Sequence, residues 1–443
     1  MSSREGRQRR RLTATEVDLG VVRQRALLVG TDVHSRSLED AEASMSELAQ
    51  LTDTAGADPV ESVLQRRTTP HPATYIGAGK VDELRELADA LDIDVVVFDD
   101  ELSPAQQRNL EKRFGRDVVD RVALILDIFA QHASSQEGMV QVELAQLRYR
   151  LPRLRGRGLE LSQQAGGIGT RGPGETQLEV DRRRIQRRVT KLEHDLDRLA
   201  RTRTTQRKAR RRQRLPTVAL VGYTNAGKST LLNRLARSDV LVQDQLFSTL
   251  DPTTRRVELA GGEIALLTDT VGFVRRLPHQ LVEAFKSTLE EVVDADFLLH
   301  VVDLSAPDVE AQVDAVRDVL HEIGASERPE LLVLNKVDVA GPDAGIALRA
   351  DSEPITVSAR TGEGVEKLEA MIASRLRALD PVLELAVPFD RGDVMAALHR
   401  DGEILVEVQG DEGTRVRARI PDTAVHRFAA FVVDGPGPTD GDR

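Results

Sequence analysis

The apolar positions of the first third of the chain alternate between two periodicities. Short apolar runs predict strands near residues 25–30, 60–64 and 93–98. Amphipathic stretches predict helices over residues 38–51, 79–91 and 103–114. A further apolar run, Val122–Phe129, closes the region. Strands that alternate with helices indicate a small parallel α/β domain, which we expect over residues 21–132.

From residue 131 onward the apolar spacing becomes helical. A first set of positions comprises Val140, Leu144, Leu147 and Leu151. A second set has the four-three spacing of a coiled-coil seam and comprises Ile185, Val189, Leu192, Leu196 and Leu199. Two such segments joined by a loop predict an antiparallel helical hairpin over residues 133–214.

The loop of this hairpin, residues 153–176, is rich in arginine and glycine and has no aromatic residue. Glycine lets a backbone approach another molecule closely, and arginine pairs with phosphates through two hydrogen bonds. We therefore expect a displayed tip that docks on folded RNA without base stacking. The alternative is a flexible linker.

The pattern changes again at Thr217, where an apolar run predicts a buried strand. The run continues as Gly222-x-x-x-x-Gly227-Lys228-Ser229 and passes into an apolar helical segment, residues 231–235. Strand, glycine-rich loop and helix are the context that a phosphate loop requires. Lys228 would reach the β- and γ-phosphates of a nucleotide, and the Ser229 hydroxyl would hold Mg²⁺.

Further motifs follow predicted strands in a domain expected over residues 215–376. The strand at 263–267 leads into Asp269-Thr270-Val271-Gly272, where the Asp can bind Mg²⁺ through water and the Gly272 N–H can sense the γ-phosphate. The strand at 330–334 ends in Asn335-Lys336-Val337-Asp338, whose last carboxylate can accept both N1–H and N2–H₂ of guanine. The segment 355–360 predicts a strand and a loop that touches the base.

The segment Phe247-Ser248-Thr249-Leu250-Asp251-Pro252-Thr253-Thr254 lies between the phosphate loop and Asp269. One of its hydroxyls should bind Mg²⁺ when a γ-phosphate is present. Spacing alone leaves Ser248, Thr249, Thr253 and Thr254 open.

The C-terminal part predicts a small α+β module over residues 381–433. Its pattern indicates a strand, a helix and a hairpin, at residues 382–387, 391–400, 403–409 and 414–420. The polar residues 1–20 and 434–443 are expected to be disordered. The predicted fold is thus multidomain α/β: a parallel α/β domain, a helical hairpin, a P-loop GTPase domain and an α+β module.

Composition sharpens this picture at one place. The net charge is −11, yet residues 148–214 hold 21 Lys and Arg against 7 Asp and Glu. A basic block in an acidic chain indicates a local polyanion site, with a solvated helix face as the alternative. The chain has no Cys, which excludes disulfides and thiolate metal sites, and no long apolar stretch. We expect a cytoplasmic monomer without a membrane span.

The combined motifs resemble the HflX family of ribosome-associated GTPases, from about Arg25 to Phe431. Residues 166–185, beginning Gly-Gly-Ile-Gly-Thr-Arg-Gly-Pro-Gly-Glu-Thr, look like the glycine-rich segment of the family. Residues 247–255 look like its switch I. The resemblance selects Thr249 as the Mg²⁺ ligand of switch I. It also implies binding to the large ribosomal subunit and its RNA, with the splitting or recycling of stalled ribosomes.

The resemblance and the motifs together define the expected site. Lys228, Thr249 and Gly272 would carry catalysis, Ser229 and Thr249 would hold Mg²⁺, and Asn225 sits where potassium-stimulated relatives carry an Asn. The expected contacts with GTP or GDP comprise Gly222, Tyr223, Thr224, Asn225, Ala226, Gly227, Lys228, Ser229, Phe247, Ser248, Thr249, Leu250, Asp251, Asp269, Thr270, Val271, Gly272, Asn335, Lys336, Val337, Asp338, Ser358, Ala359 and Arg360.

One residue limits the predicted reaction. Many GTPases place a water-orienting Gln directly after the Asp-x-x-Gly motif, and Phe273 stands there in this chain. A phenyl ring cannot orient water, so we expect slow intrinsic hydrolysis that a partner stimulates.

Other classes of protein remain open from the sequence. A small-molecule kinase could use the same phosphate loop, although the two later motifs argue against it. An RNA-binding or ATP-dependent RNA-remodelling protein with a regulatory GTP site is the second alternative. Its ATP site would involve Gly77-Ala78-Gly79-Lys80, which we interpret instead as the start of a helix because the full spacing is missing.

Overall fold

The computed structural model describes most of the chain, namely residues 23–33, 38–154, 177–212, 215–237, 246–247, 249–276, 286–340, 354–421 and 424–433. The expected disordered ends, the arginine- and glycine-rich loop from residue 155 and Ser248 lie outside these residues. The chain forms two compact units, Met1–Asp120 and Arg121–Arg443.

The first unit is built on a four-stranded parallel sheet with the order β2-β1-β3-β4. Its strands are β1 (Gln24–Val33), β2 (Ala57–Arg67), β3 (Val95–Phe98) and β4 (Asp117–Asp120). The connecting helices are α1 (Leu38–Thr54), α2 (Ala78–Ala90) and α3 (Pro104–Phe114). This arrangement confirms the predicted parallel α/β fold. Strand β4 was not predicted, because four residues are too few to show a periodicity.

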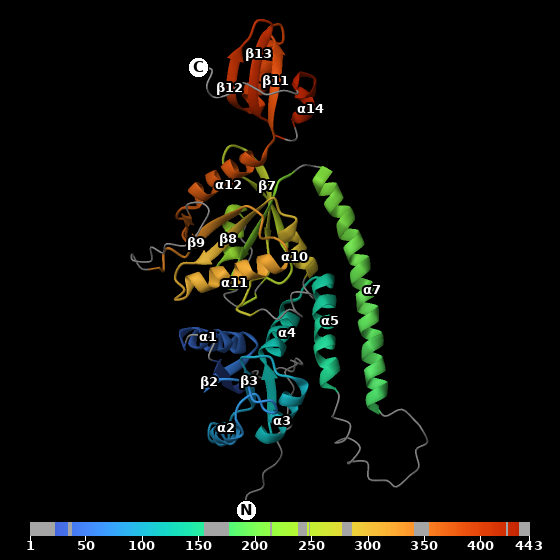
Figure 1. The fold of residues 1–443 in the computed structure, drawn as a ribbon, viewed down its shortest axis with the longest axis vertical. Coiled ribbons are helices and arrows are strands. Elements are labelled where there is room, and N and C mark those ends of the chain that lie inside the picture. The colour runs from blue at the N-terminus through green and yellow to red at the C-terminus, as the bar shows by residue number, and fades with distance from the viewer. Residues whose placement is uncertain are drawn as a thin grey trace, which may run out of the picture. The chain divides into compact units, whose positions relative to one another are not determined.

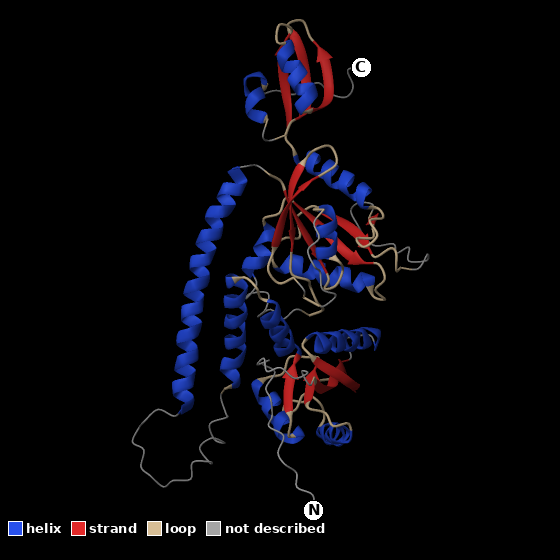
Figure 2. Cartoon of the chain, turned by 180° about the vertical axis from the view of Figure 1, so that it is seen from behind, coloured by secondary structure: helices blue, strands red, loops and turns tan. Residues whose placement is uncertain are grey.

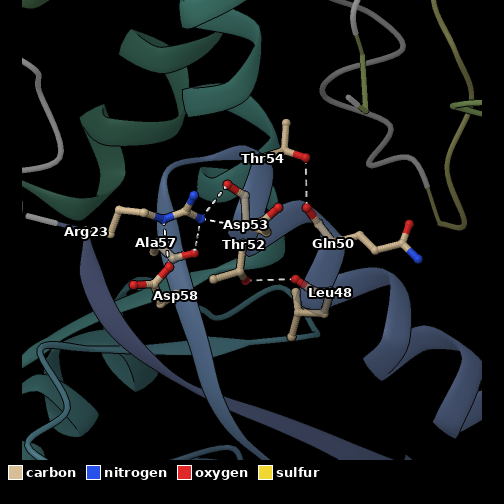
Figure 3. A network of polar contacts seen from close by, with 8 residues as sticks. All are labelled: Arg23, Leu48, Gln50, Thr52, Asp53, Thr54, Ala57 and Asp58. Atoms are coloured by element: carbon tan, nitrogen blue, oxygen red, sulfur yellow. Dashed lines mark hydrogen bonds and ion pairs between the residues drawn. The ribbon is translucent and has the colours of Figure 1, made fainter. Parts of the chain in front are cut away.

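An arginine holds the edge of this sheet together (Figure 3). The Arg23 guanidinium donates to the carbonyl oxygen of Ala57 at 2.9 Å and pairs with the Asp58 carboxylate at 2.7 Å. It also binds Asp53 in the last turn of α1. The planar fork of arginine therefore joins the end of α1 to the start of β2.

Three helices open the second unit: α4 (Arg121–His132), α5 (Gln136–Arg153) and α7 (Gln177–Arg212). The apolar run Val122–Phe129 belongs to α4, so the break between units precedes it. Helices α5 and α7 run antiparallel side by side (Figure 1). Leu144, Val189 and Leu192 form their buried seam. The seam confirms the predicted antiparallel hairpin.

A six-stranded sheet with the order β10-β9-β8-β5-β7-β6 forms the nucleotide domain. Its strands are β5 (Thr217–Gly222), β6 (Thr253–Glu258), β7 (Ile264–Asp269), β8 (Phe297–Asp303), β9 (Glu330–Asn335) and β10 (Ile355–Thr356). All pairings are parallel except that of β6 with β7. The carboxyl ends of the parallel strands therefore meet at one edge, where the predicted motifs begin.

Helices cover both faces of this sheet (Figure 2). Helices α8 (Lys228–Leu235) and α12 (Val365–Leu379) share one apolar core with the sheet. Helices α10 (Lys286–Val293) and α11 (Val309–Glu322) share the core on the other face. Because both faces are buried, the central strands are almost continuously aliphatic.

The C-terminal module is a three-stranded antiparallel sheet with the order β11-β13-β12. Its elements are β11 (Val382–Pro388), α13 (Gly392–Asp401), β12 (Glu403–Gln409), β13 (Gly413–Arg419), α14 (Val425–Phe428) and a 3₁₀ turn (Ala429–Phe431). Leu385, Leu398 and Phe428 lie in its core. The predicted α+β module is thus confirmed. Within the described residues, no helix is long and apolar enough to span a membrane.

Ser103 is the N-cap of α3 and provides a test of this local structure. Its hydroxyl accepts from the Gln106 N–H at 3.2 Å, while the Gln106 side chain accepts from the Ser103 N–H at 2.9 Å. Ser103→Ala should destabilise α3 by ~1 kcal/mol. Amide hydrogen exchange in α3 should then accelerate about fivefold, because ~1.4 kcal/mol corresponds to a factor of ten. Ser62→Ala on exposed β2 is the control, and equal exchange in both variants would contradict the assignment.

Candidate functional site

The phosphate loop follows the central strand β5 and ends at the first residue of α8. Gly222 has φ +150°, and a Cβ atom there would lie 2.2 Å from the carbonyl oxygen of Val301. Only glycine allows β5 to turn this close to β8. Asn225, inside the loop, has φ +58°, a conformation that Asn tolerates better than most residues.

Lys228 is buried beneath this loop and points back at it. Its ammonium donates to the carbonyl oxygens of Gly222 at 3.1 Å and Tyr223 at 2.9 Å. Burial lowers the pKa of Lys228 to about 8, although the nearby Asp269 carboxylate opposes the shift. Phosphate oxygens would supply the negative charge that the buried ammonium requires.

Side-chain oxygens that could be metal ligands come from three separate segments and meet beside Lys228. The Ser229 hydroxyl lies 2.7 Å from the Thr249 hydroxyl and donates to the Asp269 carboxylate at 2.6 Å. Burial raises the pKa of Asp269, while the Lys228 charge and hydrogen bonds oppose the shift. Of the three described candidates, Thr249, Thr253 and Thr254, Thr249 is therefore the one whose hydroxyl the structure brings to Ser229. Ser248 lies outside the described residues.

These donors fit a small, hard cation such as Mg²⁺. The Oδ1 atom of Asp269 is buried and has no hydrogen-bond partner among the described residues. A metal-bound water would satisfy it. Across the described ranges, no group of three His, Cys, Asp or Glu side chains is arranged to hold a metal. A metal at this site would consequently depend on hydroxyls and phosphates for most of its ligands.

Asn335 at the end of β9 ties the base-recognition loops to the phosphate loop. Its amide donates to the carbonyl oxygen of Ala226 at 2.8 Å and accepts from the Ala359 N–H at 2.9 Å. The Asp338 carboxylate is bound by Arg360, and the Ser358 hydroxyl together with Arg360 lowers the pKa of Asp338. These contacts favour the ionised carboxylate, whose oxygens are acceptors for N–H donors such as guanine N1–H and N2–H₂.

Most of the predicted residues surround one cavity of about 490 Å³. Its predicted lining residues are Thr224, Asn225, Gly227, Lys228, Ser229, Phe247, Thr249, Thr270, Gly272, Asn335, Lys336, Asp338, Ala359 and Arg360. The cavity spans the distance from the metal donors to the base motif. It can therefore hold a whole nucleotide in a single extended site.

Several predicted contact residues lie behind this lining. Leu250 is buried, and Asp251 faces Ser134 and Ser135 instead of the cavity. The Tyr223 hydroxyl accepts from the Arg275 N–H at 2.7 Å, and its ring lies in the core. The others outside the lining are Gly222, Ala226, Asp269, Val271, Val337 and Ser358.

The sequence reasoning also missed three lining residues, Thr230, Ser305 and Val339. Thr230 and Val339 directly follow residues that were predicted. Ser305 follows β8, and the rule that parallel strands end at the same sheet edge could have found it.

Phe273 does not reach the cavity. Its side chain is 1% exposed and packs in the core. Its N–H donates to the Gly222 carbonyl oxygen at 3.1 Å, and its own carbonyl accepts from the Thr224 N–H at 2.7 Å. Phe273 therefore continues the packing beside the phosphate loop and presents no group to the γ-phosphate position.

Three family models match the chain between residues 42 and 336. Residues 42–130 match a family described as GTP-binding GTPase N-terminal, and residues 132–210 match its middle region. Residues 217–336 match a family described as 50S ribosome-binding GTPase.

Curated relatives match over most of the chain. GTPase HflX from Lacrimispora saccharolytica is 46% identical over 91% of this chain and 95% of its own. GTPase HflX from Escherichia coli is 43% identical over 85% of this chain and 89% of its own. A solved GTP-binding protein from Sulfolobus solfataricus in complex with GDP is 24% identical, covers 81% of this chain and 100% of its own, and has a TM-score of 0.41.

The agreement extends over both units and includes the nucleotide domain whose cavity is described above. Binding of GTP and GDP and hydrolysis of GTP follow from this membership. The chain belongs to the GTPase HflX family.

Proposed function

We propose that this GTPase binds the large ribosomal subunit and its RNA, and that it splits or recycles stalled ribosomes. The observation that carries the proposal is the direct attachment of a basic helical hairpin to the nucleotide domain. Helix α7 presents exposed arginines at positions 182–184, 187 and 188 and ends shortly before β5. The description of the matched family, 50S ribosome-binding GTPase, supports the same partner.

The chemistry is in-line attack of water on the γ-phosphate. Lys228 and the loop N–H groups would stabilise the charge that develops on the phosphates. Ser229 and Thr249 would hold Mg²⁺, with Asp269 binding through water, and the ion would neutralise phosphate charge when bound. The Gly272 N–H would contact the γ-phosphate. Asn225 is exposed at the cavity, where its amide oxygen can add a K⁺ ligand.

Slow hydrolysis in the absence of the ribosome belongs to the same proposal. The residue after Gly272 is the buried Phe273, so its side chain cannot hold the attacking water. A partner that rearranges the switches would complete the site, and the nucleotide would act as a timer for a ribosome-bound probe. Because it would bind ribosomes, we propose that the protein is located in the cytoplasm. We also propose that it acts as a monomer.

The rate of hydrolysis with and without ribosomal subunits tests the timer. We expect the purified protein to turn over slowly and large subunits to raise kcat by at least tenfold. Lys228→Ala should remove both rates, because the buried ammonium is lost from the phosphates. The readout is phosphate release from GTP. Full activity without subunits, with no stimulation when they are added, would contradict the proposal.

Base recognition by Asp338 has its own test. Asp338→Asn keeps the size of the side chain but replaces one acceptor oxygen by an NH₂ group. This group is a donor and cannot accept a hydrogen bond from guanine. We expect GTP affinity to fall tenfold to a hundredfold, since hydrogen bonds to a charged group contribute about 1.5–3 kcal/mol. Affinity for xanthosine triphosphate, which carries an oxygen at C2, should rise. Asp318→Asn on exposed α11 is the control, and unchanged base preference in Asp338→Asn would refute the assignment.

The hairpin tip is tested by sedimentation with large subunits and a non-hydrolysable GTP analogue. Residues 155–176 are replaced by a Gly/Ser linker of equal length, which keeps the two helices joined. We expect co-sedimentation to be lost and nucleotide affinity to stay unchanged, because the arginines that pair with RNA phosphates are gone. Undiminished binding to the subunit would show that the tip is not the RNA probe.

A further inference from the structure

The turn between α4 and α5, residues Ala133–Ser135, is called the elbow below. Asp251 is bound to it by several hydrogen bonds. Its carboxylate accepts from the Ser134 N–H at 2.9 Å, the Ser134 hydroxyl at 2.8 Å and the Ser135 N–H at 2.6 Å. The Ser135 hydroxyl donates to it as well. The carboxylate also lies at the N-terminus of α5, where free N–H groups and the helix dipole favour a negative charge.

The contact between Asp251 and the elbow leaves no spare room. A Cβ atom on Gly138, in the first turn of α5, would lie 2.3 Å from the Asp251 Oδ1 atom. Ser135 is at the same time the N-cap of α5, because its hydroxyl accepts from the Gly138 N–H at 2.9 Å. The side chain of Asp251 is therefore built into the start of the hairpin.

A second contact joins the same segment to α4. The rings of Phe129 and Phe247 meet edge to face, with centroids 4.6 Å apart and an interplanar angle of 84°. Both rings are buried. Phe247 has φ +57°, a conformation that costs a non-glycine residue ~1–3 kcal/mol and persists only where the surroundings hold it. Burial against Phe129 supplies that support.

Thr249 lies between these two anchors, two residues from each. Its hydroxyl is the one that meets Ser229 beside Asp269. A short segment attached at both ends has little conformational freedom, so the anchors decide where its middle residue sits. The elbow thereby acts on the metal donors without touching the nucleotide cavity.

Helix α4 also contacts the strand-end segment on the other side of the site. The buried Arg121 guanidinium donates to the carbonyl oxygen of Arg275 at 3.2 Å. Arg275 comes shortly after Gly272, and its side chain is paired with Asp308. Helix α4 and the elbow thus contact both segments that a γ-phosphate would contact, the one around Thr249 and the one after Gly272.

We propose that the elbow is the support of switch I, and that Asp251 and Phe247 are positioning residues that hold Thr249 at the metal. This inference rests on the proposed role of Thr249 as a metal ligand. Switch segments of GTPases are ordered by γ-phosphate and Mg²⁺ contacts and released after hydrolysis. Release of Thr249 then strains the Asp251 contact at the start of α5. Because coupling between sites is reciprocal, a partner that moves the hairpin changes the preference for GTP over GDP.

Nucleotide affinities of Asp251→Asn test the positioning role. All donors of the elbow point at carboxylate oxygens, so an amide would set N–H groups against N–H groups. With fluorescent nucleotides and Mg²⁺, we expect the affinity for a non-hydrolysable GTP analogue to fall about tenfold, with GDP affinity within about twofold, since tenfold corresponds to ~1.4 kcal/mol. Glu258→Gln on exposed β6 is the control and should change neither.

Two results of this experiment overturn the inference. Unchanged affinity for both nucleotides would show that Thr249 does not depend on the anchor. An equal loss for both would show that Asp251 only stabilises the fold. The double variant Ser134→Ala/Ser135→Ala repeats the test from the other side of the contact and should weaken binding of the GTP analogue selectively.

Amide exchange of the unmodified protein gives a test that needs no variant. The N–H groups of Ser134 and Ser135 donate to Asp251, so their exchange reports whether the contact is closed. We expect slower exchange of this peptide with the GTP analogue than with GDP, and equal exchange in both states would overturn the coupling. Neither result depends on ribosomes, so failure of subunit stimulation would refute the proposed function and leave the elbow intact.

Discussion

The double hydrogen bond of the buried Asn335 amide is the constraint on which the nucleotide site depends. It joins the phosphate loop at Ala226 to the last loop at Ala359, and these two loops are far apart from each other in the sequence. An amide can make this link because it donates and accepts at once. Loss of either bond would leave buried backbone groups unpaired and separate the base motif from the phosphate site.

The phosphate end of the site depends on charged groups. Lys228 is buried with Asp269 nearby, and burial disfavours the charged form of each. Each group offsets part of this cost for the other, and bound phosphate and a divalent cation would add further opposite charge. The apolar sheet around them keeps the local dielectric low, which strengthens every such interaction.

Two sets of side-chain contacts join the helices that open the second unit to the nucleotide domain. Asp251 contacts the elbow and Phe247 contacts Phe129 of α4, and these two residues lie on either side of Thr249. A change at the metal can reach the first turn of α5 through a few side chains. A probe and a timer need such a connection if hydrolysis is to be read out on RNA.

Strong periodicity and motif spacing determined much of the molecule from the sequence alone. The first three strands of the parallel N-terminal sheet, the hairpin seam, strands β5, β7, β9 and β10 of the nucleotide domain and the C-terminal hairpin were predicted. Local signals sufficed there because each element carries its own pattern, and parallel strands bring their ends to one edge. The run Val122–Phe129 is compatible with a strand or a buried helix, and β4 has only four residues. Strand β6 is mostly polar, so it shows no apolar run.

Spacing left the switch I hydroxyl open and the resemblance selected Thr249, but only the tertiary structure placed the Thr249 hydroxyl beside Ser229 and turned Asp251 toward the elbow. Both outcomes depend on contacts between residues that are distant in the sequence, such as Asp251 with Ser135. Spacing along the chain carries no information about such contacts. The direction of the segment depends on the packing of Phe247 against Phe129, and this contact forms only in the folded chain. The sequence determined the chemistry available, and the fold determined where each group acts.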